Sequence, residues 1–269
     1  MFRNQYDSDI STFSPQGRLF QIEYALEAVK QGSACVGIKS KTHVVLVALQ
    51  RQGGELASYQ KKVVKLDNHM GIAFAGLTSD ARVLSNYMRN ECMRHKMVFA
   101  RPLPALRAVT SVADKAQINT QRYGSRPYGV GFLIASADDA GVHLHEFSPT
   151  GNAPDYLAHS IGSRSQSART YLEKHVDAFA SASLDELVQH GLHALRDTLP
   201  SDKELTVENV AVAVVGVDTP FAQLGRDQVD AQLQRFNATI GQGAAAAAAG
   251  AAPSGGAGAG DDDAMDTTE

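Results

Sequence analysis

The chain has 269 residues, of which 43% are apolar and 20% are charged, enough for one large domain with a substantial core. Its 25 basic and 29 acidic residues give a formal charge of -4. Five of the acids and no base lie in residues 241–269, so the rest of the chain carries 25 basic and 24 acidic residues. A near-neutral body offers no strong field for nucleic acid or an anionic membrane, and neither is expected as a partner.

The cysteines and the N-terminus bear on the compartment. Cys35 and Cys92 lie in no CxxC motif and at no Cys/His ligand spacing, so the sequence predicts no metal site and favours a reduced compartment. The first residues lack the apolar core of a signal peptide, and no apolar run approaches the roughly 18 residues of a membrane span. We therefore expect a protein of the cytoplasm and nucleus, without a membrane partner.

The first predicted element is a helix over residues 14–30. Ser14 is a good N-cap, and Pro15 sacrifices no hydrogen bond at the first helical position. Apolar residues recur at spacings of three and four up to Val29, so one face of the helix must pack against something, and Gly32 suits its end. Residues 1–13 are expected to precede this helix as a polar arm.

Further along, short runs rich in β-branched residues predict antiparallel strands, and amphipathic runs predict helices. The strands are expected at residues 34–39, 43–49, 63–66, 70–75, 128–136, 142–147, 156–161 and 209–217. The helices are expected at residues 79–96, 103–119, 165–179, 183–198 and 225–236. Strands and helices come in blocks without regular βαβ alternation, which predicts an α+β fold with helices outside packed sheets.

Residues 241–269 have a different composition, with eleven Ala and seven Gly followed by an acidic run. Such a segment buries too little apolar area to offset its ordering entropy, so a disordered tail is expected. A helix over the alanines 244–249 is the alternative, although an isolated helix needs roughly 12 residues. No specific partner is predicted for the acidic end, which is expected to stay solvated.

The sequence contains none of the common nucleotide, metalloprotease, serine-hydrolase or calcium motifs, and no cofactor is predicted. Gly129 and Gly131 lie within a predicted strand and indicate close backbone packing. Two histidine pairs share a strand face or a helical turn but lack an identifiable third metal ligand: His143 with His145, and His190 with His193. Ser33 is a candidate nucleophile, yet nothing local supplies a base, so alone it is interpreted as structural.

Longer motifs carry a specific resemblance. Tyr6-Asp7 and the run FSPQGRLFQIEYA at 13–25 closely resemble the signature that opens α-type subunits of the proteasome core particle. The resemblance continues through residues 71–84, 121–131 and 161–172, and covers about residues 1–237. The opening MFRNQYD and residues 101–104 are most similar to one eukaryotic class of the family. The resemblance divides the chain into an N-terminal gate arm (1–13), a proteasome α-type domain (14–240) and the tail (241–269).

The family implies the N-terminal nucleophile hydrolase fold, a four-layer αββα sandwich of two antiparallel sheets, here with an extra N-terminal α-subunit helix. Its catalytic members are β-type subunits, in which a free N-terminal threonine works with an Asp and a Lys. The matching positions in this chain are Ser33, Leu49 and Lys62. Since the Ser33 amine is locked in a peptide bond and the carboxylate is missing, we expect a non-catalytic subunit of a threonine endopeptidase complex.

The resemblance also implies two non-catalytic sites. Four residues match the gate cluster formed by the N-terminal arms of the α ring: Tyr6, Asp7, Pro15 and Tyr24. Four match the pocket between adjacent subunits that receives the C-terminal tails of activators: Gly17, Lys62, Gly76 and Leu77. Lys62 would bind a terminal carboxylate, whereas without the family match it would be interpreted as a solvated loop lysine. Ser8 replaces the family's usual Arg and removes a charged gate contact.

The implied partners are other α subunits in a seven-membered ring, the β ring, and the C-terminal tails of regulatory-particle ATPases and other activators. The leading hypothesis is a non-catalytic α-ring subunit of the 20S proteasome core particle, which scaffolds assembly and contributes to gate and docking pocket in ubiquitin-dependent degradation. One alternative is an active hydrolase that uses Ser33 after cleavage, which would require loss of residues 1–32. Another is a free-standing binding module, which the arm signature opposes.

Overall fold

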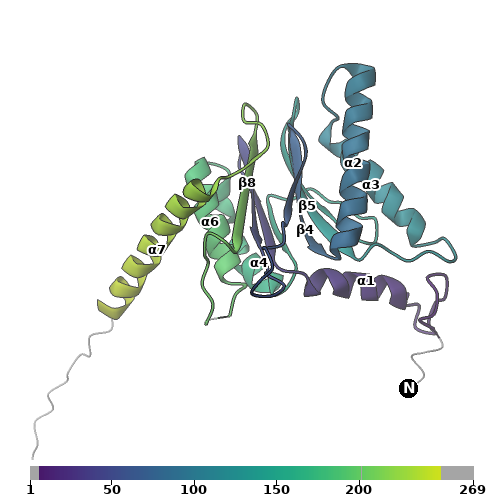
Figure 1. The fold of residues 1–269 in the computed structure, drawn as a ribbon, viewed down its shortest axis with the longest axis horizontal. Coiled ribbons are helices and arrows are strands. Elements are labelled where there is room, and N and C mark those ends of the chain that lie inside the picture. The colour runs from purple at the N-terminus through teal and green to yellow at the C-terminus, as the bar shows by residue number, and fades with distance from the viewer. Residues whose placement is uncertain (1–5, 201, 250–269) are drawn as a thin grey trace, which may run out of the picture. The chain divides into compact units, whose positions relative to one another are not determined.

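The computed structural model describes residues 6–200 and 202–249 (Figure 1). The chain divides into two compact units, residues 1–236 and residues 237–269. The described part of the second unit, residues 237–249, is helical and belongs to α7 (Arg226–Ala249). Within the described ranges, no helix is long and apolar enough to cross a membrane.

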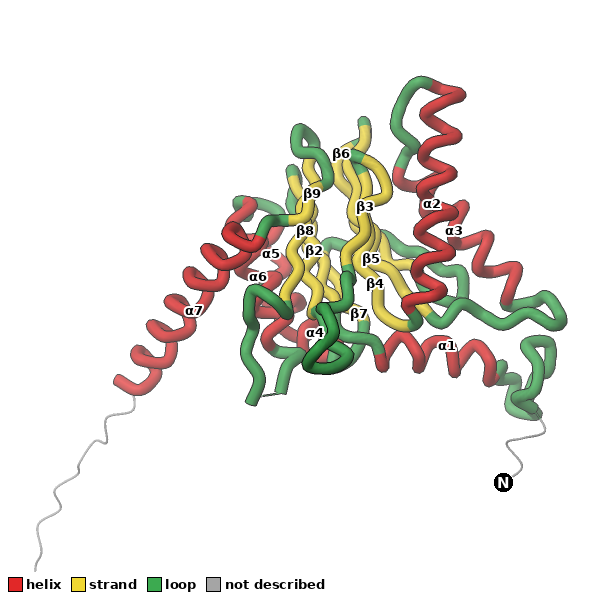
Figure 2. Tube along the Cα trace, viewed as in Figure 1, coloured by secondary structure: helices red, strands yellow, loops and turns green. Residues whose placement is uncertain are grey.

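Two antiparallel sheets form the centre of the first unit (Figure 2). The five-stranded sheet has the order β7-β1-β2-β8-β9, and the four-stranded sheet has the order β3-β4-β5-β6. The strands of the first sheet are β1 (Cys35–Lys39), β2 (His43–Leu49), β7 (Ala158–Ile161), β8 (Val210–Gly216) and β9 (Ala222–Gln223). Those of the second are β3 (Val63–Asp67), β4 (Met70–Gly76), β5 (Val130–Asp138) and β6 (Gly141–Phe147).

Alternating side chains of the central strands serve two different cores, which explains why these strands are continuous apolar runs in the sequence. On β2, Val44 and Leu46 belong to the core between the two sheets, whereas Val45 and Val47 belong to the core under the helices. On β4, the odd residues Ala73 and Ala75 face the inter-sheet core. Each central strand is therefore buried on both faces.

Helices cover the outer face of each sheet. The helices α4 (Ser165–Lys174), α5 (Val176–Phe179), α6 (Leu184–Arg196) and the first part of α7 contribute to the core on the five-stranded sheet. The helices α2 (Thr78–Phe99) and α3 (Ala105–Asn119) contribute to the core on the four-stranded sheet. The predicted αββα sandwich is confirmed (Figure 1).

The helix α1 (Phe20–Gln31) packs at the end of the four-stranded sheet, against β4 and β5 (Figure 1). A side chain at Gly131 would lie 3.0 Å from Val29 of α1, and one at Gly129 would lie 2.9 Å from Leu77. Gly131 therefore permits the close approach of α1 and β5, and Gly129 permits that of Leu77, which confirms the close packing predicted for both glycines.

The predicted start of this helix at Ser14 is wrong, because Ser14 is the first residue of a turn that precedes the helix. Its carbonyl accepts a hydrogen bond from the Gly17 amide at 2.9 Å, and its hydroxyl accepts one from the Arg18 amide at 3.1 Å. Gly17 has φ +74°, a left-handed conformation that cannot continue a helix. The helix begins only at Phe20, and its end at Gln31 is followed by Gly32, as predicted.

Three further differences have local causes. The helix predicted at 165–179 is interrupted at His175, whose ring donates from Nδ1 to the Tyr171 carbonyl at 2.8 Å. The strand β9 was not predicted, since two exposed residues carry no alternation. Residues 241–249 are helical rather than disordered, because the alanines extend an existing helix and need no new nucleus. Residues 250–269 of the predicted tail, and residues 1–5 of the arm, lie outside the described residues.

Acidification should destabilise this fold through its buried histidines. His190 and His193 of α6 pack around Tyr171, and burial lowers the pKa of both rings below 6.5. Near pH 6 the unfolded chain therefore binds more protons than the folded one, and the free energy of unfolding falls as pH drops through about 6.5. The slope approaches about 1.4 kcal/mol per pH unit for each histidine that titrates fully. Urea unfolding of the full chain at a series of pH values measures it.

Replacing both rings, as His190→Gln with His193→Gln, should flatten the profile between about pH 5 and 7, which bracket the ordinary histidine pKa. His143→Gln is the matched control, because this ring pairs with Asp138 on a strand far along the chain from α6. An unchanged slope in the double variant would contradict the assignment.

Candidate functional site

The arm and the first turns of α1 bring two of the predicted gate residues together. The Tyr24 hydroxyl donates a hydrogen bond to Asp7 Oδ2 at 3.0 Å. The side-chain amide of Gln21, one helical turn earlier, donates to the backbone carbonyl of Asp7. Both contacts cross from the arm to one face of the helix, so they fix the direction in which the arm leaves it.

The other two predicted gate residues are placed differently. Pro15 is exposed in the turn that precedes α1, and Tyr6 is half-buried at the start of the described chain. Within the described ranges, no hydrogen bond or ring contact joins Tyr6 or Pro15 to the other gate residues. An anchor that the sequence analysis missed is Ile10, the one apolar residue in the run 7–12, which is fully buried. Its isolation within a polar segment is the signal that could have found it.

The nucleophile position of the superfamily is inaccessible in this chain. Ser33 is 3% exposed, and the chain runs on through Gly32 into α1. The Gly32 carbonyl accepts from the Ser163 amide at 2.7 Å, and the Gly32 amide donates to the Val29 carbonyl at 3.0 Å. The peptide bond before Ser33 is thus held on both sides, and there is no free amine to act as a base.

The position of the supporting carboxylate is filled by an apolar side chain. Leu49 ends β2, its amide donates to the Ala34 carbonyl at 2.9 Å, and its side chain packs in the core under the helices. A carboxylate that could orient an ammonium or a hydroxyl is therefore missing where the superfamily has one. The geometry agrees with the predicted catalytic silence.

Lys62 is 2% exposed, so its interpretation as a solvated loop lysine is wrong. Its ammonium lies 4.8 Å from the centre of the Phe74 ring, and its ionisable neighbours are the Cys35 thiol and the Arg51 guanidinium. Burial lowers the pKa of Lys62 and raises the pKa of Cys35 to about 11, so the thiol is neutral near pH 7. The cation therefore has no ionised acid among these neighbours to compensate its charge.

Gly76 and Leu77 lie close to Lys62 because β3 pairs with β4. The Phe74 amide donates to the Lys62 carbonyl at 3.2 Å, two residues before Gly76. Leu77 is exposed, and its amide donates to the Gly129 carbonyl at 2.9 Å. The structure thus brings three of the four predicted pocket residues to one junction of β3, β4 and α2.

The fourth predicted pocket residue, Gly17, is not part of this junction. It precedes α1, whereas Gly32 at the far end of α1 touches the Gly76 backbone. Twelve helical residues span about 18 Å, so a single chain cannot close the predicted pocket around all four residues. Of the four predicted pocket residues, the chain by itself therefore groups only Lys62, Gly76 and Leu77.

Comparison with known proteins identifies the family. The family described as proteasome subunit matches residues 29–215, and the N-terminal signature of A-type proteasome subunits matches residues 6–28. The chain belongs to the proteasome subunit family. Its α-type signature covers the arm from Tyr6 onward and α1 as far as Ala28, and so includes Asp7 and Tyr24.

Curated relatives of the same family match most of the chain. The probable alpha type-6 proteasome subunit of Schizosaccharomyces pombe is 60% identical over 82% of this chain and 81% of its own length. The alpha type-1 proteasome subunit of Dictyostelium discoideum is 55% identical, over 86% of this chain and 93% of its own length. The alpha type-6 proteasome subunit of Saccharomyces cerevisiae is 56% identical, over 82% of this chain and 95% of its own length. Types 1 and 6 name the class that MFRNQYD and residues 101–104 indicated.

These findings confirm the predicted role of a non-catalytic α-ring subunit of the proteasome core, a complex that degrades proteins. The alternative of a hydrolase that uses Ser33 after cleavage is not favoured. Cleavage before Ser33 would remove the matched signature and α1 together.

The close approach at Gly76 gives a prediction on stability. Gly76 has φ +117°, and a Cβ there would lie 2.2 Å from the Gly129 carbonyl oxygen. Gly76→Ala should lower the free energy of unfolding by about 3 kcal/mol, through backbone strain and overpacking together. Gly141→Ala is the matched control, because Gly141 has φ +121° but nothing within 4 Å of the added carbon. We expect it to lose only about 1 kcal/mol. Equal losses in urea unfolding would exclude the contact as the cause.

Proposed function

We propose that this chain, in its place in the α ring, helps to hold shut the gate through which substrates enter and supplies part of a docking pocket for activator tails. The observation that carries the first part is the hydrogen bond between Tyr24 and Asp7. The second part rests on the buried ammonium of Lys62, whose ionisable neighbours in the described part of the chain are a thiol and a guanidinium. The residues in both parts are those that match the family's motifs in the sequence.

The gate contact ties the arm to a rigid helix. Asp7 is held at its side chain by Tyr24 and at its backbone by Gln21, both on α1. A hydrogen bond to a carboxylate contributes about 1.5–3 kcal/mol when water is excluded, and less at this partly exposed position. The contact therefore biases the arm toward one direction without locking it, as a gate that must open requires. Ser8 is exposed beside it and adds no charge to this contact.

The pocket would give Lys62 an anion that its ionisable neighbours among the described residues do not supply. A tail that ends in a carboxylate compensates a cation through a charge-assisted hydrogen bond, and this bond is strong where water is scarce. Gly76 and the exposed Leu77 border the same junction and offer backbone and apolar contact to such a tail. Gly17, at the other end of α1, would serve the pocket of a neighbouring subunit.

The proposed partners of this chain belong to the complete particle. We place the chain in a seven-membered ring of α subunits against the β ring, whose threonine endopeptidase subunits carry out hydrolysis in ubiquitin-dependent degradation. The tails of regulatory-particle ATPases and other activators are the proposed ligands of the pocket. The cytoplasm and nucleus are the proposed compartments.

Loosening the arm should open the gate. Tyr24→Phe keeps the ring and removes the donor to Asp7, so basal peptide hydrolysis by the assembled particle should rise, by about fivefold if the contact contributes about 1 kcal/mol. Deleting residues 2–12 should have at least the same effect. Tyr123→Phe is the control, because this tyrosine is 82% exposed. If neither the Tyr24→Phe variant nor the deletion changes hydrolysis, the other arms hold the gate and this part of the proposal fails.

Removing the Lys62 charge should separate a docking role from a structural one. Lys62→Met fills the same space without a buried charge, so the free energy of unfolding should stay constant or rise. Photo-cross-linking of an activator-tail peptide to this chain in the assembled particle should nevertheless fall by about tenfold or more, since a charge-assisted bond is lost. Lys61→Met, at an exposed position next to it, should leave cross-linking unchanged. Undiminished cross-linking in the Lys62→Met variant would refute the pocket.

A further inference from the structure

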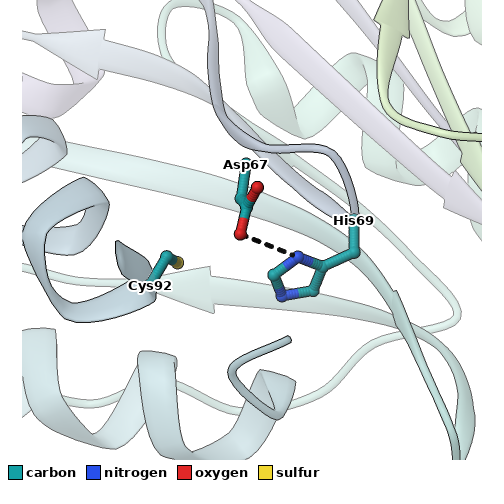
Figure 3. A group of neighbouring side chains, drawn as sticks. All are labelled: Asp67, His69 and Cys92. Atoms are coloured by element: carbon teal, nitrogen blue, oxygen red, sulfur yellow. Dashed lines mark ion pairs between the residues drawn. The ribbon is translucent and has the colours of Figure 1, made fainter. Parts of the chain in front are cut away.

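Three side chains of different chemistry converge beside the four-stranded sheet, away from the gate and Lys62. Asp67 ends β3, His69 lies in the turn before β4, and Cys92 lies on the buried face of α2 (Figure 3). One donor atom from each lies within 4.8 Å of the other two. The side chains of Asp67 and His69 are 20% and 10% exposed, so the cluster is nearly closed but reachable from solvent.

The hydrogen bonds of His69 determine where its lone pair points. Its Nε2 lies 2.8 Å from the Leu103 carbonyl oxygen, which can only accept, so Nε2 carries the hydrogen. In a neutral imidazole, Nδ1 is then an acceptor with a free lone pair. This Nδ1 is buried without a hydrogen-bond partner, and it lies 3.5 Å from Asp67 Oδ2.

Two acceptors that face each other in a buried place need a cation between them. The carboxylate of Asp67 is already oriented for this, because its Oδ1 accepts from the Asn68 amide at 2.7 Å and its Oδ2 is left toward His69. The cation is either a proton on Nδ1 or a metal ion. The Cys92 sulfur on the third side favours a metal, since a proton between nitrogen and oxygen has no use for a sulfur donor.

We infer that Asp67, His69 and Cys92 form a binding site for a divalent transition metal of borderline softness, with zinc as the best match. One oxygen, one nitrogen and one sulfur donor are the ligand types that zinc accepts, and a water would complete a tetrahedron from the exposed side. Tetrahedral bonds of about 2.0–2.3 Å place ligand atoms about 3.3–3.8 Å apart. The Asp67–His69 pair already has this separation, and the sulfur reaches it by a side-chain shift of about 1 Å.

The surroundings hold each ligand in place, as a metal site requires. The Leu103 carbonyl fixes the tautomer and the ring plane of His69, which is the usual outer contact of a metal-binding histidine. The backbone of His69 is held where its carbonyl accepts from the Ala137 amide at 2.9 Å. In the metal-free chain Cys92 is a thiol, so binding would exchange one proton for the metal: the S–H bond breaks, the metal–thiolate bond forms and the proton passes to solvent.

Cobalt(II) is the probe, because it reports directly on a sulfur ligand. We expect the full chain, titrated anaerobically with Co²⁺, to develop a thiolate-to-cobalt charge-transfer band and the visible bands of tetrahedral cobalt, saturating at one ion per chain. Zinc should displace the cobalt and abolish both bands. Cys92→Ala should remove the charge-transfer band, and His69→Gln and Asp67→Asn should each weaken zinc binding by more than about tenfold.

Matched controls keep the result interpretable. Cys35→Ala removes the other buried thiol and should leave the band intact, and His143→Gln removes a histidine that pairs with a carboxylate outside this cluster. Circular dichroism and the unfolding midpoint establish that each variant folds. If the wild-type chain shows no charge-transfer band, or keeps it in the Cys92→Ala variant, the site is refuted.

Discussion

The close contact of three backbone segments fixes the arrangement on which the rest of the molecule depends. The end of α1 at Gly32, the end of β4 at Gly76 and the start of β5 at Gly129 approach so closely that a Cβ on Gly32 or Gly76 would overlap a main-chain atom. This contact pins α1 against the sheet edge and carries the chain without interruption into Ser33. The feature that blocks the superfamily's catalytic amine is therefore also the feature that positions the arm.

Lys62 keeps the lysine of the catalytic subunits, but in this chain the lysine has a different role. The sequence resemblance implies that in the catalytic members of the superfamily a lysine at this position works beside a threonine and a carboxylate. In this chain the carboxylate position is Leu49, and the serine is buried within the chain. A buried ammonium beside a neutral thiol and an aromatic ring costs stability unless an anion arrives from outside. Its presence beside these neighbours therefore argues for a ligand rather than for a role in folding.

The sequence was most informative where one physical pattern dominated. Runs rich in β-branched residues located the strands from β1 to β8, and the pattern was clearest in β2, β4, β5 and β8, which are buried on both faces over almost their whole length. The predicted start of α1 was wrong because Gly17 adopts φ +74°, which a helix does not allow, and because a residue that caps a helix well also favours a turn. Motif spacing did not predict the Asp67–His69–Cys92 cluster, because its third residue lies on a helix, 23 residues after His69 in the sequence. Pairing of Asp7 with Tyr24 needed the family resemblance.

The two proposed family sites lie at opposite ends of α1, and this has a mechanical consequence. The gate contact involves the first turns of the helix, whereas Gly76 lies by its end, and Lys62 bonds to Phe74, two residues before Gly76. Since α1 runs from one site to the other, a link between the two sites within one chain can pass along this helix. If Gly17 borders a neighbour's pocket, a tail bound there touches the turn from which this arm departs, and pocket occupancy and arm direction are coupled through that turn.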